Sequence, residues 1–281
     1  MQRPLVFLDT ESATLHGPPH LIELAAVRVV DGDAVDRFAE LVRPEVPVDE
    51  GTSAIHGLTI DDLRGADGAA VVLARFLAWL DPEDWLVAHN MPADANVLGF
   101  ELARAGLVPP RNPLFDTLKL TRRGLRDAPD HKLATLVEYL GLDVDTTHRA
   151  LADAVACWQV FEAALRLLLE EEAETAAESA REPTEATILR HAAISGTLDQ
   201  YLPAPPSRQR AAVRRLERAR RDACVVTLVY GEETARPAEL AVLPRLLFRR
   251  EKRGYLEGEC QSSGILKTYR LDRIHRIHEA R

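Results

Sequence analysis

The chain has 281 residues, of which 46% are hydrophobic and 28% are charged. This composition predicts a folded protein with a sizeable core, and the length favours one larger and one smaller domain. No apolar run approaches the ~18 residues of a membrane-spanning helix, and we expect no secretory signal and no membrane partner. Three scattered cysteines argue against a disulfide framework or a cysteine zinc site and favour a cytoplasmic protein.

The net charge of −9 is divided unevenly along the chain. Residues 1–182 contain 16 Lys and Arg against 32 Asp and Glu, a net charge of −16, whereas residues 183–281 contain 19 against 12, a net charge of +7. An acidic part can hold metal cations, and a basic part can approach phosphates. Ordinary solvated surfaces can have the same composition, so charge alone does not decide between these interpretations.

The first 182 residues show strand patterns first and then alternating helix and strand patterns. Hydrophobic spacing predicts strands over Leu5–Asp9, Leu21–Val30, Arg37–Val42 and Trp85–Ala88. It predicts helices over Gly68–Leu80, Asp94–Ala105, His131–Leu140 and Thr147 to about Ala180. This order is typical of an α/β fold in which a mixed sheet is flanked by helices.

A domain boundary is expected at Arg181–Thr187, after the acidic end of the last helix. A helix over Ala186–Leu202, a proline-rich link and a very basic helix over Arg208–Arg221 follow. The remaining chain predicts short strands over Cys224–Tyr230, Leu240–Leu243, Arg245–Arg250, Tyr255–Glu259 and Leu266–Leu271. We therefore expect a first domain over residues 1–182, a helical and basic linker over 183–222, and a small β domain over 223–281.

Four acids stand where strands end or helices begin. Asp9 and Glu11 end the first strand, and residues two apart on a strand point to the same side. Asp94 and Asp153 each begin a helix, and mixed α/β folds build their sites at such places. Carboxylate oxygens suit Mg²⁺ or Mn²⁺, and two such cations about 4 Å apart can serve a phosphoryl displacement. The pattern predicts a site for two divalent cations.

His148 adds a group that titrates near neutral pH, five residues before Asp153. From the loop before the last helix it can take a proton from an attacking water. Each residue alone also has an ordinary interpretation: an Asp-x-Glu pair as a turn, Asp94 as a helix cap, and His148 as a surface histidine.

The first domain resembles the DEDDh branch of the 3′→5′ exonucleases, the family of the polymerase III proofreading subunit and RNase T. The resemblance is carried by Phe7-Leu8-Asp9-Thr10-Glu11, Leu21–Val27, Ile55–Thr59, Val87–Asn90 with Asp94, Asp116–Leu118 and His148–Ala154. It implies an RNase H-like fold. Two departures are Ala93, where the family usually has an aromatic residue, and Ser12-Ala13, where it often has Thr-Gly. The second leaves the substrate preference open.

The resemblance also implies roles for individual residues. Asp9, Glu11 and Asp153 would surround one metal ion, and Asp9 with Asp94 the second. His148 would act as the general base. The terminal nucleotide of the substrate would be bound by Thr10, Ser12, His56 and Asn90.

The C-terminal part resembles the WYL domain, a small SH3-like β domain, through Arg249–Glu259 and Thr268–Ile274. Gly254-Tyr255-Leu256 stands at the signature tripeptide, whose first aromatic residue is absent. The resemblance implies that Tyr255, Arg270 and Arg273 bind single-stranded nucleic acid or a nucleotide-like ligand by stacking and phosphate pairing. Alternatively, Tyr255 belongs to the core, Arg273 pairs with an acid, and the domain docks a protein partner.

Together these patterns predict a metal-dependent 3′→5′ exonuclease that acts on single-stranded 3′ ends and releases nucleoside monophosphates. The favoured substrate is DNA rather than RNA, and the expected role is in DNA repair or proofreading. Two other hypotheses stay open: a non-catalytic module that binds 3′ ends or tethers a polymerase, and a regulator in which a ligand of the C-terminal domain gates the nuclease.

Overall fold

The computed structural model describes residues 3–144, 148–175, 185–207, 211–232 and 237–279, without the side chains of residues 172–175. The chain separates into two compact units, Met1–Tyr201 and Leu202–Arg281. Residues 185–201, which we expected in a linker, lie in the first unit because they add a strand and packing helices to it.

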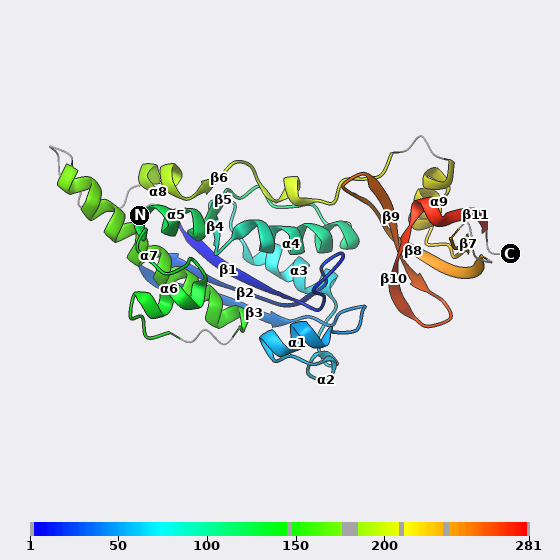
Figure 1. Cartoon of the computed structure of the whole chain (residues 1–281), viewed down its shortest axis with the longest axis horizontal. Coiled ribbons are helices and arrows are strands. Elements are labelled where there is room, and N and C mark those ends of the chain that lie inside the picture. Colours follow the sequence, from blue (N-terminus) through cyan, green and yellow to red (C-terminus); the bar gives the residue numbers. More distant parts are fainter. Residues whose placement is uncertain (1–2, 145–147, 176–184, 208–210, 233–236, 280–281) are drawn as a thin grey trace. The chain divides into compact units, whose positions relative to one another are not determined.

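The first unit is built on a six-stranded mixed sheet with the order β3-β2-β1-β4-β5-β6 (Figure 1). Three antiparallel strands come first: β1 (Leu5–Ser12), β2 (Leu21–Val30) and β3 (Asp33–Leu41). Two parallel strands continue from β1, namely β4 (Trp85–Ala88) and β5 (Leu114–Asp116), and β6 (Ala193–Ile194) closes the sheet antiparallel to β5. The predicted mixed α/β fold is confirmed.

Helices cover both faces of this sheet. On one face α7 (Ala150–Thr175) packs on β1 and β2 together with α5 (Thr117–Gly124) and α6 (Leu133–Tyr139). The other face carries α4 (Met91–Ala105) and α3 (Ala69–Trp79). The remaining helices are α1 (Glu50–His56), α2 (Ile60–Leu63), α8 (Glu185–His191) and the 3₁₀ turn η1 (Leu198–Tyr201).

Helices cover both faces of the sheet, so side chains on both sides of β1 are buried. This explains why the sequence of β1 begins with a continuous apolar run. Leu5 and Phe7 point to the α7 face, where the Phe7 ring meets Phe161 edge-on at 5.3 Å. Because strand residues alternate, Asp9 and Glu11 continue this row. Both carboxylates therefore point to the side of the sheet that α7 covers, at the end of β1.

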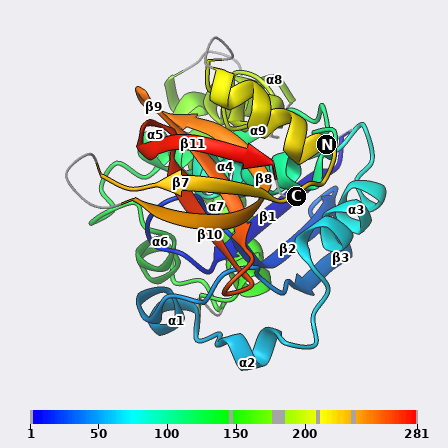
Figure 2. The same ribbon diagram turned by 90° about the vertical axis from the view of Figure 1, so that its right-hand side faces the viewer.

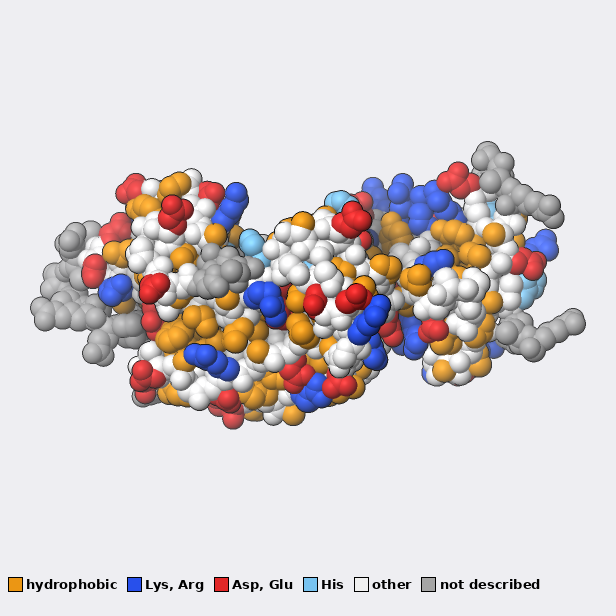
Figure 3. All heavy atoms as spheres, turned by 90° about the horizontal axis from the view of Figure 1, so that it is seen from below, with side chains coloured by type: hydrophobic (Ala, Val, Ile, Leu, Met, Phe, Trp, Pro, Cys, Tyr) orange, Lys and Arg blue, Asp and Glu red, His pale blue; other side chains and the backbone are white. Residues whose placement is uncertain are grey.

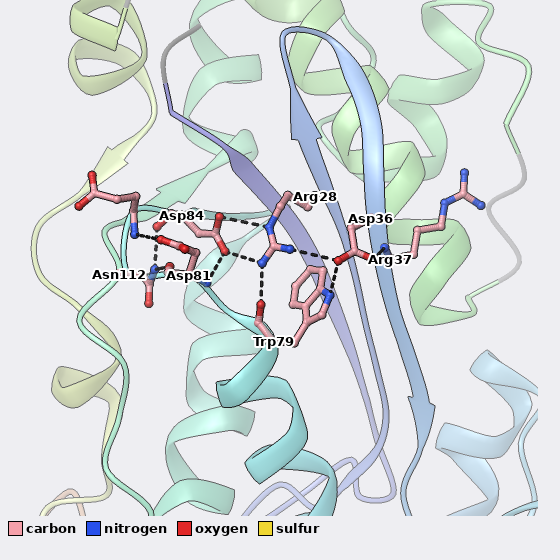
Figure 4. A network of polar contacts seen from close by, with 8 residues as sticks. Arg28, Asp36, Arg37, Trp79, Asp81, Asp84 and Asn112 are labelled. Carbon is pink, nitrogen blue, oxygen red and sulfur yellow. Dashed lines mark hydrogen bonds and ion pairs between the residues drawn. The ribbon is translucent and has the colours of Figure 1, made fainter.

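A polar network ties the opposite end of the sheet together (Figure 4). Asp84, just before β4, is fully buried and accepts hydrogen bonds from Arg28 of β2, the shorter at 2.8 Å from Nη2. The same Nη2 donates to the Trp79 carbonyl at 2.7 Å, and Arg28 Nη1 and Trp79 Nε1 both reach Asp36 of β3. The network joins four elements without any residue of the predicted site.

The second unit is a five-stranded antiparallel sheet with the order β10-β9-β8-β7-β11. Its strands are β7 (Val226–Tyr230), β8 (Ala238–Arg250), β9 (Arg253–Cys260), β10 (Ile265–Arg270) and β11 (Ile274–Glu279), with the 3₁₀ turn η2 (Leu271–Arg273) before the last. Helix α9 (Ala211–Arg221) buries Val213, Leu216 and Ala219 against this sheet (Figure 2).

Several predicted elements are wrong in detail. The helix expected over Ala186–Leu202 ends at His191, because β6 pairs with β5 and Gly196 turns the chain with φ of 102°. The two strands expected on either side of Pro244 are one strand, β8, which absorbs the proline at a register shift. Helix α7 begins at Ala150; Thr147, residues 176–180 and the start of the basic helix, 208–210, lie outside the described residues.

Candidate active site

Three of the four predicted acids come together at the end of β1. Asp9 and Glu11 lie on β1, and Asp153 lies in the first turn of α7. One carboxylate oxygen of each lies within 4.8 Å of the others. Strand β1 and helix α7 are more than 140 residues apart in the sequence, and the fold brings their carboxylate oxygens together.

Asp94, the fourth acid, is buried in the first turn of α4 and is held by β1. Its Oδ1 accepts the backbone N–H of Thr10 at 2.9 Å and the Thr10 hydroxyl at 2.8 Å. The start of α4 is itself fixed, because Asn90 has φ of 69° and donates its N–H to Asp116 at 2.9 Å. Asp116 also accepts the N–H of Leu118 and so joins the starts of α4 and α5.

The acids strongly influence one another's protonation. Burial, reinforced by Asp153, Glu23 and Asp94, raises the pKa of Glu11 to about 8. Burial also raises the pKa of Asp94 to about 7, against the hydrogen bonds from Thr10, and the pKa of Asp9 rises well above its usual value for the same reason and because Asp94 lies nearby. Concentrated buried negative charge is unfavourable unless cations balance it. The set therefore fits divalent cations with a preference for oxygen ligands.

His148 lies at the edge of this cluster, two residues before the start of α7. Its Nδ1 is 3.8 Å from Oδ2 of Asp153, and its side chain is 54% exposed. The backbone of His148 has φ of 51°, a left-handed conformation that is uncommon for a residue other than glycine. Neighbouring contacts must hold this conformation, which places an accessible imidazole beside a predicted metal ligand.

The residues predicted to bind the terminal nucleotide have structural contacts of their own. Both donors of Thr10 go to Asp94, and the Ser12 hydroxyl accepts the N–H of His20 at 3.2 Å. His56 ends α1 and accepts the N–H of Leu58 at its Nδ1. Burial lowers the pKa of His56, and the nearby backbone of Ser12 opposes that shift. Because Ser12 is the last residue of β1, His56 lies next to the end of this strand.

Two important acids were not predicted as site residues. Asp116 fixes the helix starts described above, and Glu23 of β2 binds Arg149 and the N–H of Ala150 next to His148. The sequence contained one signal for Glu23, a charged residue inside the apolar run Leu21–Val30, where burial without a partner is costly.

In the second unit, two of the three predicted ligand-binding residues lie in one row. Tyr255 of β9 stands opposite Phe248 of β8 and Arg270 of β10, and its ring stacks on Phe248 at 5.3 Å. Arg270 pairs with Asp272 at 2.6 Å. Arg273 lies in η2 and pairs with Glu232 at 2.8 Å.

Comparison with protein families defines the class of this protein. The family model described as "Exonuclease" matches residues 6–161, more than half of the chain, and the chain belongs to this family. Residues 211–279 match the model of the WYL domain. The protein is thus an exonuclease-family enzyme with an attached WYL domain, as the sequence predicted.

Curated relatives share the first unit. The DNA polymerase III PolC-type of Oceanobacillus iheyensis is 35% identical over 152 residues, which cover 54% of this chain and 11% of that protein. The PolC-type polymerase of Listeria monocytogenes is 35% identical over 136 residues, 48% of this chain and 9% of that protein. The chain therefore matches about a tenth of the length of these relatives.

Solved structures show the same fold. E. coli Exonuclease I in complex with a dT13 oligonucleotide has a TM-score of 0.53 at 14% identity, covering 99% of this chain and 66% of that chain. The nuclease domain of 3′hExo, a DEDDh family member bound to rAMP, has a TM-score of 0.50 at 20% identity, covering 56% and 89%. The expected RNase H-like exonuclease fold is confirmed.

Proposed function

We propose that this protein is a metal-dependent 3′→5′ exonuclease that removes nucleotides from single-stranded 3′ ends. The observation that carries the proposal is the convergence of Asp9, Glu11 and Asp153 within 4.8 Å, with Asp94 fixed beside them by Thr10 and His148 at their edge. Asp9, Glu11 and Asp153 would hold one divalent cation, Mg²⁺ or Mn²⁺, and Asp9 with Asp94 would hold a second. When bound, these cations supply Lewis-acid stabilisation of the oxygens that attack and leave phosphorus.

The side chains of this protein have separate tasks in that reaction. His148 has its Nδ1 turned toward Asp153, which leaves Nε2 to accept the proton of the attacking water. Attack on the last phosphodiester breaks the bond to the 3′ oxygen of the preceding nucleotide and releases a nucleoside monophosphate. Thr10 keeps Asp94 in place, and Ser12, His56 and Asn90 line the place of the terminal nucleotide.

DNA is the favoured substrate over RNA. The support is the 35% identity to the DNA polymerase III PolC-type relatives, whose name refers to DNA. A role in DNA repair or proofreading would follow from this preference. The four acids and His148 do not themselves require a 2′-hydroxyl, so the nucleic-acid class has to be measured.

The WYL domain is proposed to bind the single-stranded substrate. Four exposed cationic side chains stand at and beside the turn between β8 and β9: Arg249 and Arg250 at the end of β8, Lys252 in the turn next to Glu251, and Arg253 at the start of β9. They lie next to the Phe248–Tyr255–Arg270 row. Within the described residues, no ion pair engages these four side chains. Figure 3 shows a dense group of Lys and Arg side chains on the second unit. Cations for phosphates beside an aromatic ring for a base are what single-strand binding requires.

We also propose a cellular location for the protein. Within the described residues no helix is both long and apolar enough to cross a membrane. Cys157, Cys224 and Cys260 are free, which agrees with a reducing compartment. We place the enzyme in the cytoplasm.

The test uses single-stranded DNA and RNA of the same sequence, each labelled at the 5′ end. The full-length protein is incubated with Mg²⁺, with Mn²⁺ or with EDTA, beside the Asp9→Ala variant. A further substrate carries a nuclease-resistant linkage at its 3′ end. We expect a metal-dependent ladder that shortens from the 3′ end, that the resistant linkage blocks and that Asp9→Ala lowers by several orders of magnitude.

Each other outcome changes the proposal in a defined way. If Asp9→Ala is as active as the wild type, the proposed metal ligands are wrong. If the substrate with the resistant 3′ linkage is degraded, the proposed 3′→5′ direction is wrong. Binding without degradation would instead support a non-catalytic module that binds 3′ ends. Activity that requires an added nucleotide would support a ligand-gated nuclease.

A further inference from the structure

Glu23 is a buried carboxylate that the proposed chemistry does not use. It lies on β2 directly opposite Glu11 of β1, and only 6% of the residue is exposed. A second acid beside a buried acid is unfavourable without a compensating partner. The contacts of Glu23 identify that partner and suggest a task.

Both oxygens of Glu23 are occupied by the segment that follows His148. Arg149 donates from Nη2 to Oε1 at 2.7 Å and from Nε to Oε2 at 3.0 Å, a two-point contact that fixes the orientation of both groups. The backbone N–H of Ala150 donates to Oε2 at 3.1 Å. Ala150 is the first residue of α7, where backbone N–H groups have no partner within the helix.

These contacts lie directly beside a strained backbone. His148 adopts φ of 51°, and for a residue with a Cβ atom the left-handed conformation is unfavourable. Glu23 ties down the two residues after His148, and the Asp153 N–H continues the helix by donating to the Arg149 carbonyl at 3.0 Å. The position of the imidazole relative to Asp153 therefore depends on how firmly this junction is held.

We infer that Glu23 is a positioning residue, which holds the His148-Arg149-Ala150 junction so that the imidazole lies over the metal-binding acids. Glu23 is not one of the three acids whose oxygens converge within 4.8 Å, and both of its own oxygens accept hydrogen bonds from Arg149 and Ala150. This inference rests on the proposed function, since it assumes that His148 accepts the proton of the attacking water.

The test compares Glu23→Gln with a matched control, Asp84→Asn. Asp84 is a buried acid that also binds one arginine at two points and one backbone N–H, that of Asp81, but at the opposite end of the sheet (Figure 4). Both variants lose a charged acceptor. We expect both to lower Tm, but only Glu23→Gln to lower kcat selectively, by about 10–100-fold with KM within twofold, because small misplacements of a catalytic group have effects of this size.

A double-mutant cycle with His148→Ala separates positioning from general stability. If Glu23 acts through His148, Glu23→Gln lowers kcat in the wild-type background but not in the His148→Ala background, so the Glu23→Gln/His148→Ala variant is no slower than His148→Ala alone. Asp84→Asn should leave kcat unchanged in both backgrounds and gives the baseline. If Glu23→Gln does not fold, Arg149→Met repeats the test, because it removes the Glu23–Arg149 contact by changing the half-exposed partner.

Two results would overturn the inference: a wild-type kcat in folded Glu23→Gln, or multiplicative losses in the double variant. A wild-type protein that degrades neither DNA nor RNA contradicts the proposed function instead, so the two failures can be told apart.

Discussion

Thr10 donates both its backbone N–H and its hydroxyl to the same oxygen of Asp94, at 2.9 and 2.8 Å. Thr10 directly follows Asp9, so this pair of hydrogen bonds links the acid at the end of β1 to the acid at the start of α4. In the proposed mechanism these acids share one cation. Their separation is therefore set by a residue that is not itself a ligand.

Replacing Thr10 by Val should weaken this link without changing the size of the side chain much. The backbone N–H remains, but the hydroxyl bond to a carboxylate is removed, and such bonds contribute about 1.5–3 kcal/mol. We expect kcat to fall about 10-fold or more and half-maximal activity to require a higher Mg²⁺ concentration. Both are measured in a Mg²⁺ titration of the initial rate.

Thr10→Ser is the control for that experiment, since it keeps the hydroxyl and should stay close to the wild type. An unchanged Mg²⁺ dependence in Thr10→Val would show that the backbone N–H alone positions Asp94.

The raised carboxylate pKa values predict an unusual pH dependence for the metal-free protein. The pKa is about 8 for Glu11 and about 7 for Asp94, above the values of about 4 in an unfolded chain. The folded state then binds more protons than the unfolded state between these limits, so stability falls as pH rises. With EDTA, we expect Tm to decrease from pH 5.5 to pH 8.5.

Added Mg²⁺ should reverse this trend, because binding favours ionised carboxylates. The rise in Tm on adding Mg²⁺ should therefore be larger at pH 8.5 than at pH 5.5. Asp9→Asn removes one of the interacting charges and should raise the metal-free Tm at pH 8.5 while abolishing most of the Mg²⁺ effect. A metal-free Tm that rises with pH in the wild type would contradict the assignment of these pKa shifts.

Local sequence patterns were sufficient to predict the candidate acids, but not the residues that hold the surrounding segments in place. Asp9 and Glu11 could be predicted from strand alternation, and Asp94 and Asp153 from helix starts. The partners of Glu23 could not, because Arg149 is separated from it by 126 residues and only the packing of α7 on β2 joins them. The same holds for Asp116, whose carboxylate accepts the N–H of Asn90, 26 residues earlier in the chain and directly before α4.

The errors in the fold have a similar origin. Pro244 lacks a backbone donor and therefore predicts a break between two strands, yet β8 continues past it because a register shift against β9 accommodates the missing hydrogen bond. Strand β6 consists of two residues, Ala193 and Ile194, and exists only because β5 offers an edge. No periodic pattern can develop over two residues.

His148→Gly should separate the chemical task of His148 from its backbone strain. Loss of a general base lowers the rate by about 10²–10⁴-fold, and we expect this in both His148→Ala and His148→Gly. Glycine adopts φ of 51° at little cost, whereas alanine does not, so His148→Gly should have the higher Tm. The 54% exposure of the side chain leaves space for added imidazole, which should restore part of the rate.

Rates and Tm of the two variants, with and without imidazole, check this prediction. Full activity in either variant would exclude His148 as the base. A higher Tm for His148→Ala would instead show that the left-handed backbone is not retained.

The basic turn between β8 and β9 should contribute to binding rather than to chemistry. Replacing Arg249 and Arg250 together by Ala should weaken binding of single-stranded DNA and reduce the slope of log K against log salt by about 0.7 for each phosphate that the variant no longer neutralises. Arg245→Ala is the matched control, because Arg245 lies on the same strand but pairs with Glu259 at 2.8 Å. Fluorescence anisotropy over a salt series, beside kcat at saturating substrate, measures both effects. An unchanged slope with a reduced kcat would remove this turn from the binding surface, and the row of Tyr255 and Arg270 would then have to be tested for a protein or nucleotide ligand.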